Sequence, residues 1–355
     1  MKIIKEEYTL EAVSDTLAEY MSEDCALFDI ECTGLSPKNS WIYLIGCASR
    51  KRNIITLTQF FSENSQEEKN ILEEFDIYLN DFNKVLGFNS TRFDEPYIIE
   101  RSKKLGLSHQ FNRLNHTDLY LTSSKLKCLI NLPNYKQKTI EDFLGLHRED
   151  IYDGGQLIPV YLDYVDNHNE EALKLVLLHN YEDVKGMVTA IEFLSYLPLL
   201  KSTLALSDFE FDTDENSVRV MAKLPFSLPK ALNKTRDFGL VMLKDTRVNL
   251  ISDIQRLTLN TYLKDFKNYV YHTEENMIIP KVLASTIDKC LIRPATREEC
   301  HASLESSFIR IPEHFEVPSG IMVFKDSFKS KEFFIRAEDV TEYIALQLIK
   351  YIIKH

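Results

Sequence analysis

Short runs of apolar residues in the first third of the chain predict β-strands. Residues 25–31 form one such run, and two more, at 41–48 and 54–61, are separated by a polar turn. A fourth run covers residues 84–89, and a further strand is expected just before Asp118. Because each run is short and bounded by turn-forming residues, a strand is favoured over a helix.

Helical signals alternate with the later strands. The capping box Ser-Gln-Glu-Glu opens a predicted helix at residues 65–80, and a second helix with Pro at its start is expected at 96–106. The longest predicted helix covers residues 170–197 and is stopped by Pro198. Three meandering strands followed by alternating helices and strands predict a mixed five-stranded α/β sheet flanked by helices.

The pattern changes after Pro198. Strand-like runs follow at residues 217–224, 240–251 and 257–263, and helical periodicity returns at about 337–353. We therefore expect one domain at residues 1–200 and a β-rich or α+β accessory domain at residues 201–355. The second domain contains no motif that indicates a chemical function. Whether it binds substrate or a protein partner is therefore left open.

The composition agrees with a folded chain of about two domains. Of the 355 residues, 44% are hydrophobic and 27% are charged, which excludes disordered and collagen-like proteins. The formal net charge of −12 on its own argues against a polyanionic partner. However, residues 201–355 hold 22 bases and 22 acids, so the whole acidic excess lies in residues 1–200.

The cysteines and the apolar runs indicate the cellular compartment in which the protein is expected. Six cysteines are scattered without a CxxC pair, which in so long a chain indicates reduced thiols rather than disulfides. A zinc site built from Cys290, Cys300, His301 and His272 is conceivable, but the spacing disfavours it. Because the chain shows neither a secretory signal nor an apolar run of about 18 residues, we expect a cytoplasmic protein without membrane contact.

Two carboxylates stand at the end of the first apolar strand, in Phe-Asp-Ile-Glu-Cys-Thr-Gly at residues 28–34. Asp29 and Glu31 are two residues apart and therefore project from the same face of a strand. Two such carboxylates repel each other unless a cation lies between them, and a divalent metal ion is the natural candidate. The alternative is a strand end that frays into solvent.

Two further acids could join this pair. Asp94 follows a Gly/Asn/Ser turn just before a predicted helix, where an ordinary N-cap is the alternative interpretation. His179 and Asp183 are four residues apart in the longest helix and share one face. Three small residues on that face would let the helix approach the sheet closely: Ala172, Gly186 and Ala190. The alternative is a His–Asp pair on a solvated face.

In this order the motifs resemble those of the DEDD exonuclease superfamily, which includes the proofreading exonucleases of DNA polymerases. Residues 28–34 match its first motif, residues 89–94 its second, and His179 with Asp183 its third. The likeness covers about residues 24–200. There is one departure, because His179 lies four residues before the last Asp rather than the usual five, and this leaves its role as general base open.

A second stretch narrows the resemblance. Lys-Thr-Ile-Glu-Asp-Phe-Leu-Gly-Leu-His-Arg at residues 138–148 is similar to a bacterial ribonuclease H-like branch of the superfamily. The later Gly154, Gly155 and Tyr161 fit the same branch. Residues 201–355 show only a faint similarity to the C-terminal parts of clostridial members.

The resemblance implies a ribonuclease H-like fold and a metal-dependent 3′→5′ exonuclease that acts on the 3′ end of DNA or RNA. It implies two Mg²⁺ or Mn²⁺ ions, with His179 orienting or deprotonating the attacking water. The metal ligands would be Asp29, Glu31, Asp94 and Asp183, with Asp29 between the two ions. The motif residues Thr33, Gly34 and Asn89 would contact the substrate.

Basic segments offer places for the phosphate backbone. Between residues 119 and 140 there is no acid, and four lysines follow one another there: Lys125, Lys127, Lys136 and Lys138. Residues 221–270 hold a second, local excess of bases. In both cases an ordinary solvated surface is the alternative.

Two other functions remain open on this evidence. One is a non-catalytic nucleic-acid-binding or scaffold protein that keeps a ribonuclease H-like fold. The other is an endoribonuclease that acts on hybrids. The sequence does not separate DNA from RNA, because a contact to the 2′-hydroxyl depends on the shape of a pocket.

Overall fold

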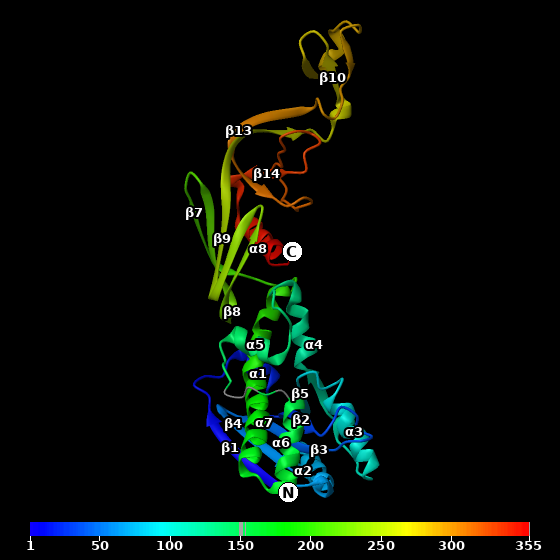
Figure 1. Ribbon diagram of the computed structural model, residues 1–355. Coiled ribbons are helices and arrows are strands. Elements are labelled where there is room, and N and C mark those ends of the chain that lie inside the picture. Colours follow the sequence, from blue (N-terminus) through cyan, green and yellow to red (C-terminus); the bar gives the residue numbers. More distant parts are fainter. Residues whose placement is uncertain (149–151, 153, 355) are drawn as a thin grey trace. The chain divides into compact units, whose positions relative to one another are not determined.

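The computed structural model describes residues 1–148, 152 and 154–354. Within these residues the chain divides into two compact units, Met1–Pro198 and Leu199–His355 (Figure 1). Each unit has its own sheet and its own apolar core. In the described residues no helix has the length and apolar character needed to cross a membrane.

A six-stranded mixed sheet forms the centre of the first unit, in the order β1-β4-β3-β2-β5-β6. β2, β3 and β4 form an antiparallel meander, and β5 and β6 add parallel to β2. The bounds are β1 Lys2–Thr9, β2 Cys25–Cys32, β3 Ile42–Lys51, β4 Ile54–Phe61, β5 Lys84–Gly87 and β6 Asn115–Asp118. The predicted mixed α/β sheet is confirmed.

The sheet has one strand more than the five predicted. β1 pairs antiparallel with β4 at the sheet edge. Its sequence, Lys-Ile-Ile-Lys-Glu-Glu-Tyr-Thr, is rich in charge and mostly exposed. Charged side chains of this kind protect an edge strand from pairing with other molecules, and they also hide the apolar run by which a strand is usually found.

Helices cover both faces of this sheet. Their bounds are α1 Asp15–Tyr20, α2 Glu68–Leu79, α3 Asp94–Lys104, α4 Leu119–Ser123, α5 Gln137–Leu144, α6 Gly154–Asn167 and α7 Glu170–Ala190. The predicted helix at 65–80 begins with a 3₁₀ turn at Ser65–Glu67, capped by Asn64 rather than by a Ser65 capping box. The longest α-helix ends at Ala190, and the chain continues to Leu200 as a 3₁₀ helix that contains Pro198.

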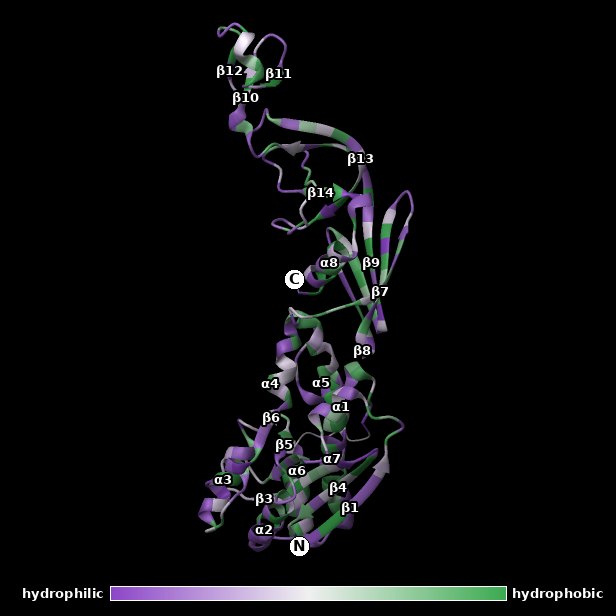
Figure 2. Ribbon diagram, turned by 180° about the vertical axis from the view of Figure 1, so that it is seen from behind, coloured by the Kyte–Doolittle hydropathy of each residue, from purple (hydrophilic) through white to green (hydrophobic). Residues whose placement is uncertain are grey.

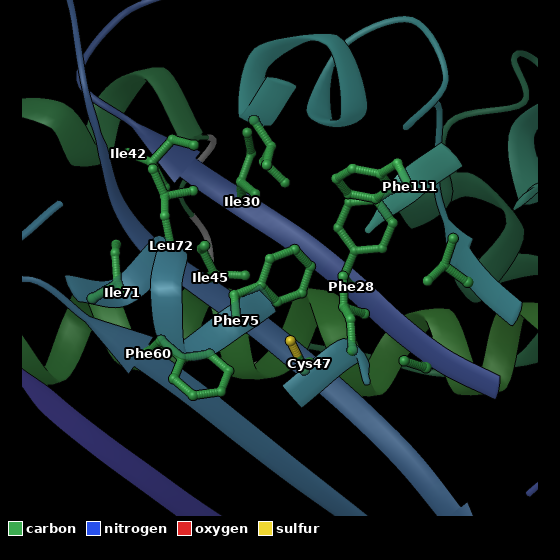
Figure 3. Packing of buried hydrophobic residues seen from close by; sticks show 14 of the residues in the cluster. Phe28, Ile30, Ile42, Ile45, Cys47, Phe60, Ile71, Leu72, Phe75 and Phe111 are labelled. Atoms are coloured by element: carbon green, nitrogen blue, oxygen red, sulfur yellow. The ribbon is translucent and has the colours of Figure 1, made fainter. Parts of the chain in front are cut away.

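Successive side chains of β2 point alternately into two apolar cores, one on each face of the sheet. Ala26, Phe28 and Ile30 face the core that α2 and α3 cover, where the ring centroids of Phe28 and Phe111 are 5.5 Å apart (Figure 3). Leu27 faces the opposite core, beside Val184 and other residues of α7. Since side chains alternate along a strand, the odd-numbered residues of β2 face α7.

The second unit is β-rich, as expected. Its five-stranded antiparallel sheet has the order β14-β13-β9-β8-β7, and a three-stranded sheet has the order β11-β10-β12. The bounds are β7 Ser207–Thr213, β8 Ser217–Arg236, β9 Gly239–Tyr262, β10 Tyr269–His272, β11 Met277–Pro280, β12 Ile292–Pro294, β13 His301–Ile311, β14 Phe333–Arg336 and α8 Glu342–Lys354. The two strand-like runs predicted at 240–251 and 257–263 belong to one long strand, β9.

One face of the larger sheet is covered by α8, which packs against β8 and β9. Along β8, Val218, Val220 and Ala222 are buried while the residues between them are exposed, and the strands change from hydrophobic to hydrophilic residue by residue (Figure 2). Ile344 and Leu348 of α8 are fully buried. This alternation is the expected result of burying one face of an antiparallel sheet.

Candidate metal centre

Four carboxylates and one imidazole line a single pocket of about 300 Å³ in the first unit. β2 contributes Asp29 and Glu31, which face α7, and α3 contributes its first residue, Asp94. The helix α7 contributes the other two groups, His179 and Asp183. The remaining lining residues are Ile30, Cys32, Gly34, Leu35, Phe88, Asn89, Phe93, Gly154, Gly155 and Ile158.

The imidazole of His179 lies between two of the carboxylates. Its Nε2 atom is 3.1 Å from Asp183 Oδ2 and 3.5 Å from Glu31 Oε1. These three side chains can each offer one ligand atom within 4.8 Å of the others, so they form a group able to hold a metal ion.

The alternative interpretations, in which these acids lie at a solvated strand end or on a solvated helix face, do not hold for this group. Glu31, Asp94 and His179 are only 7%, 6% and 3% exposed. Asp94 is the first residue of α3 and follows the N-cap, Phe93, and its Oδ1 accepts a hydrogen bond from Ile30 N at 3.3 Å. The Asp94 carboxylate therefore connects the start of α3 to β2.

Burial and mutual repulsion perturb the acids. The pKa of Asp29 lies well above its usual value, first because the carboxyl has lost its water and then because Asp183, Glu31 and Asp94 are near. Burial raises the pKa of Asp94 to about 7, against the lowering effect of its backbone hydrogen bonds. Carboxylates that resist ionisation together are stabilised by a cation, and a mainly oxygen donor set suits Mg²⁺ or Mn²⁺.

A row of residues in register across the sheet supports Asp29. Asp29 of β2 is paired with Gly46 of β3, which is paired with Gln59 of β4. Asn180 of α7 lies over this row, because its Nδ2 donates to Asp29 Oδ2 and its Oδ1 accepts from Gln59 Nε2, both at 3.0 Å. A Cβ atom at Gly46 would lie 2.1 Å from Asn180 Oδ1, so the helix can approach only over a glycine.

The expected role of the small residues on α7 is only partly right. Ala172 and Ala190 are buried, but Gly186 faces α5 rather than the sheet, since its Cβ would meet the Glu141 carboxylate. The residue that lets α7 approach the sheet is Gly46, on the strand. Sequence reasoning also missed Asn180 and Gln59, although Asn180 stands beside His179 in the third motif.

Strand β6 fixes the turn that carries Asn89 and Asp94. Asp118 accepts hydrogen bonds from Asn89 N at 3.1 Å and Thr91 Oγ1 at 2.7 Å, and it also caps α4. His116 is 2.9 Å from Ser90 Oγ through its Nε2 atom. The left-handed backbone of Asn89, with φ of 60°, is one that asparagine tolerates.

The predicted substrate residues separate into two groups. Gly34 and Asn89 line the pocket, whereas Thr33 hydrogen bonds to Trp41 at the base of the β2–β3 loop. The four lysines are not among the residues that line the pocket: Lys125, Lys127, Lys136 and Lys138. Lys138 donates to Tyr152 O at 2.7 Å, and Lys127 lies over the rings of Tyr120 and Tyr135.

The basic segment at 221–270 is partly neutralised within its own sheet. Lys223 pairs with Asp208 of β7 at 2.9 Å. The neighbouring Arg219, just outside the segment, pairs with Asp212 and Asp214. The acids of β7 and Asp214, which follows it, therefore reduce the charge that this face can present to a polyanion.

The conceivable zinc site does not form among the described residues. His272 Nδ1 accepts a hydrogen bond from Glu275 N at 3.2 Å, and Cys290 is exposed while Cys300 is buried. Among the residues that the structure describes, Glu31, His179 and Asp183 are the group that could hold a metal ion. All six cysteines are free, as predicted.

A family model matches most of the first unit. Residues 26–195 match the family model of the RNase H superfamily, so the resemblance seen in the motifs is confirmed at the level of the superfamily. No curated protein matches the chain.

Several solved structures are distantly similar. A family B DNA polymerase from the hyperthermophilic archaeon Pyrobaculum calidifontis is 13% identical with a TM-score of 0.39, over 72% of this chain and 39% of the polymerase. An exonuclease I structure is 12% identical with a TM-score of 0.34, over 62% of this chain and 55% of that one. E. coli exonuclease I with single-stranded DNA and zinc is 11% identical with a TM-score of 0.29, over 79% and 64%. All three TM-scores are below 0.5.

Proposed function

We propose that this chain is a metal-dependent 3′→5′ exonuclease of DNA or RNA, because residues 26–195 match the family model of the RNase H superfamily. One observation carries the proposal. Four carboxylates from three separate elements, with a buried histidine between two of them, line the same pocket. A sheet that needed only to fold would not place Asp29, Glu31 and Asp94 together, because such crowding costs free energy.

The four carboxylates would supply the oxygen ligands for a pair of divalent ions. Asp29, Glu31, Asp94 and Asp183 would hold them. When bound, two such ions lower the pKa of an attacking water and stabilise the oxyanion that leaves in phosphodiester hydrolysis.

Other residues in and around the pocket would act on the attacking water, on the terminal nucleotide and on Asp29. His179 would orient or deprotonate the water, since it lines the pocket beside Glu31 and Asp183. Gly34 and Asn89 line the pocket and would contact the terminal nucleotide. Asn180 would hold the Asp29 carboxylate in one orientation. The 3′→5′ direction is proposed from the resemblance of the motifs.

A panel of labelled strands tests the proposal. Single- and double-stranded DNA and RNA, labelled at the 5′ or the 3′ end, are incubated with Mg²⁺ or Mn²⁺, and circular strands are included. We expect stepwise shortening from the 3′ end by the wild type and none by the Asp29→Asn variant. Activity that persisted in EDTA or in Asp29→Asn would contradict the metal mechanism, and cutting of circles would indicate an endonuclease.

A further inference from the structure

A buried arginine lies directly behind one of the proposed metal ligands. Arg148 forms a bidentate ion pair with Glu141 of α5. Its Nε atom is 2.5 Å from Glu141 Oε2, and its Nη2 atom is 2.6 Å from Glu141 Oε1. Its remaining nitrogen, Nη1, donates to Asp183 Oδ1. The Glu141 and Arg148 side chains are only 1% and 7% exposed, so one guanidinium joins two acids away from bulk water.

The residues around the Glu141–Arg148 pair leave space for it and hydrogen bond to it. Gly186, three residues after Asp183 on α7, leaves the space that Glu141 fills, because a Cβ atom there would lie 2.0 Å from Oε1. Gln137 Nε2 donates to Glu141 Oε1 at 2.8 Å and to the backbone oxygen of Asp183 at 2.7 Å. The side chain and the backbone of Asp183 are therefore both fixed from α5.

The two oxygens of Asp183 have different partners as a result. Oδ1 is held by Arg148, whereas Oδ2 is 3.1 Å from His179 Nε2. A planar guanidinium can satisfy two carboxylates at fixed angles, which a lysine ammonium cannot do. Only one oxygen of Asp183 is left to face the pocket.

We propose that Arg148 is a positioning residue that presents Asp183 to the metal ions through Oδ2 alone, with Glu141 holding Arg148 in place. This inference rests on the proposed function. Arg148 does not line the pocket, so it acts through Asp183 rather than on substrate. Outer partners of this kind orient a ligand, and losing one weakens metal binding by about 10- to 100-fold.

The competing explanation is that the ion pair only joins α5 to α7. Two variants separate the two roles. Arg148→Met leaves Glu141 buried without its partner, which destabilises any fold. The double variant Glu141→Gln with Arg148→Met removes both buried charges and so restores stability, while Asp183 still lacks its support. Arg50→Met is the matched control, since Arg50 is a buried arginine of the same unit that donates to the backbone oxygens of Met21 and Arg52.

The measurements are the melting temperature in EDTA and the affinity for Mn²⁺ by calorimetry, without any nucleic acid. We expect Arg148→Met to melt earlier than the wild type and the double variant to recover. We expect both to bind Mn²⁺ about 10- to 100-fold more weakly, and Arg50→Met to lose only stability. On whichever labelled strand the wild type degrades, kcat falls with little change in KM.

Two results would overturn the inference, and they are distinguishable. If the double variant bound Mn²⁺ as tightly as the wild type, the network would only join two helices, and the proposed function would stand. If the wild type itself bound no Mn²⁺, the proposed function would fail together with this inference.

Discussion

The carboxyl of Asp94 shows what a single residue contributes before any cation binds. Burial raises its pKa to about 7, well above the 3.8 of an ordinary Asp. Its folded-state pKa is therefore the higher one, so protonation stabilises the fold. That contribution is complete below about pH 4 and is lost as the pH rises through about 7.

A pH dependence follows for the metal-free protein. In EDTA the melting temperature should fall between about pH 4 and pH 7 through Asp94, and Asp94→Asn should make this fall shallower. Thermal unfolding at a series of pH values measures it. Equal slopes for the two proteins would mean that Asp94 does not titrate in this range.

Asp29→Asn should separate stability from metal binding. The change replaces a carboxyl that burial and three neighbouring acids keep from ionising with a neutral side chain of the same shape. Metal-free stability near neutral pH should therefore rise by about 1 kcal/mol or more, seen as about 2–4 °C per kcal/mol. The further stabilisation that Mn²⁺ gives to the wild type should disappear. Melting curves with and without Mn²⁺ test both, with the exposed Asp166→Asn as control. A variant that Mn²⁺ still stabilised would contradict the assignment.

For single residues, spacing along the sequence could predict the acids of the site but not the residues that hydrogen bond to them. Asp29 with Glu31 and His179 with Asp183 follow from periodicities of two and four residues, which need no knowledge of the fold. The hydrogen bonds of Asn180 and Gln59 depend on which strand residues come into register below α7, and no local pattern determines that. Arg148 was visible only as part of a family-like stretch.

Among the elements, α7 and β3 approach each other closely at Gly46. Gly46→Ala would place a methyl group 2.1 Å from Asn180 Oδ1 and 2.7 Å from Val184 Cγ2, so α7 must move. We expect a loss of about 1–3 kcal/mol in the free energy of unfolding and a fall in kcat of more than about tenfold, since α7 carries His179 and Asp183.

Urea unfolding and nuclease rates measure the two effects of Gly46→Ala. Gly106→Ala is the control, because its φ of 72° strains an alanine but nothing lies within 4 Å of the new methyl group. That variant should lose stability and keep its kcat. If Gly46→Ala also kept its kcat, the spacing between α7 and the sheet would not limit catalysis.

The elements themselves were predicted unevenly, for physical reasons. The strands β2 to β5 are apolar runs and are visible in the sequence, whereas β1 is a charged edge and is not. The predicted end of the longest helix at Pro198 is wrong for the α-helix, because the chain from Ile191 to Leu200 forms a 3₁₀ helix that contains this proline. Apolar periodicity does not distinguish these two kinds of helix over so short a span.

For the whole molecule, the division after Pro198 makes a direct test possible. Residues 1–198 contain the complete pocket and their own core. Expressed alone, they should unfold cooperatively and bind Mn²⁺ like the full chain, while the KM for nucleic acid rises if Leu199–His355 binds substrate. Calorimetry and steady-state kinetics on both chains measure this. Loss of Mn²⁺ binding would show that the metal centre needs the second unit.

The net charge of −12 leads to a prediction about salt. The acidic excess lies in residues 1–200, so nucleic acid must approach against it, and bound Mg²⁺ and the local lysines would have to screen that charge. Binding of short DNA or RNA by the Asp29→Asn variant with Mg²⁺ should be weak and should fall steeply between about 50 and 200 mM salt. Fluorescence anisotropy measures it, and an affinity that did not change with salt would contradict this view.

The bridge from Asn180 to Asp29 and Gln59 also limits which changes in chain length the first unit can accept. One residue inserted into α7 before Asn180 would rotate the rest of the helix by about 100° and advance it by about 1.5 Å, breaking both hydrogen bonds. Asp183 would turn away from β2 in the same step, and so would His179 if the insertion preceded it. Natural insertions and deletions should therefore be absent between Glu170 and Asp183 and should accumulate in the loops outside α7.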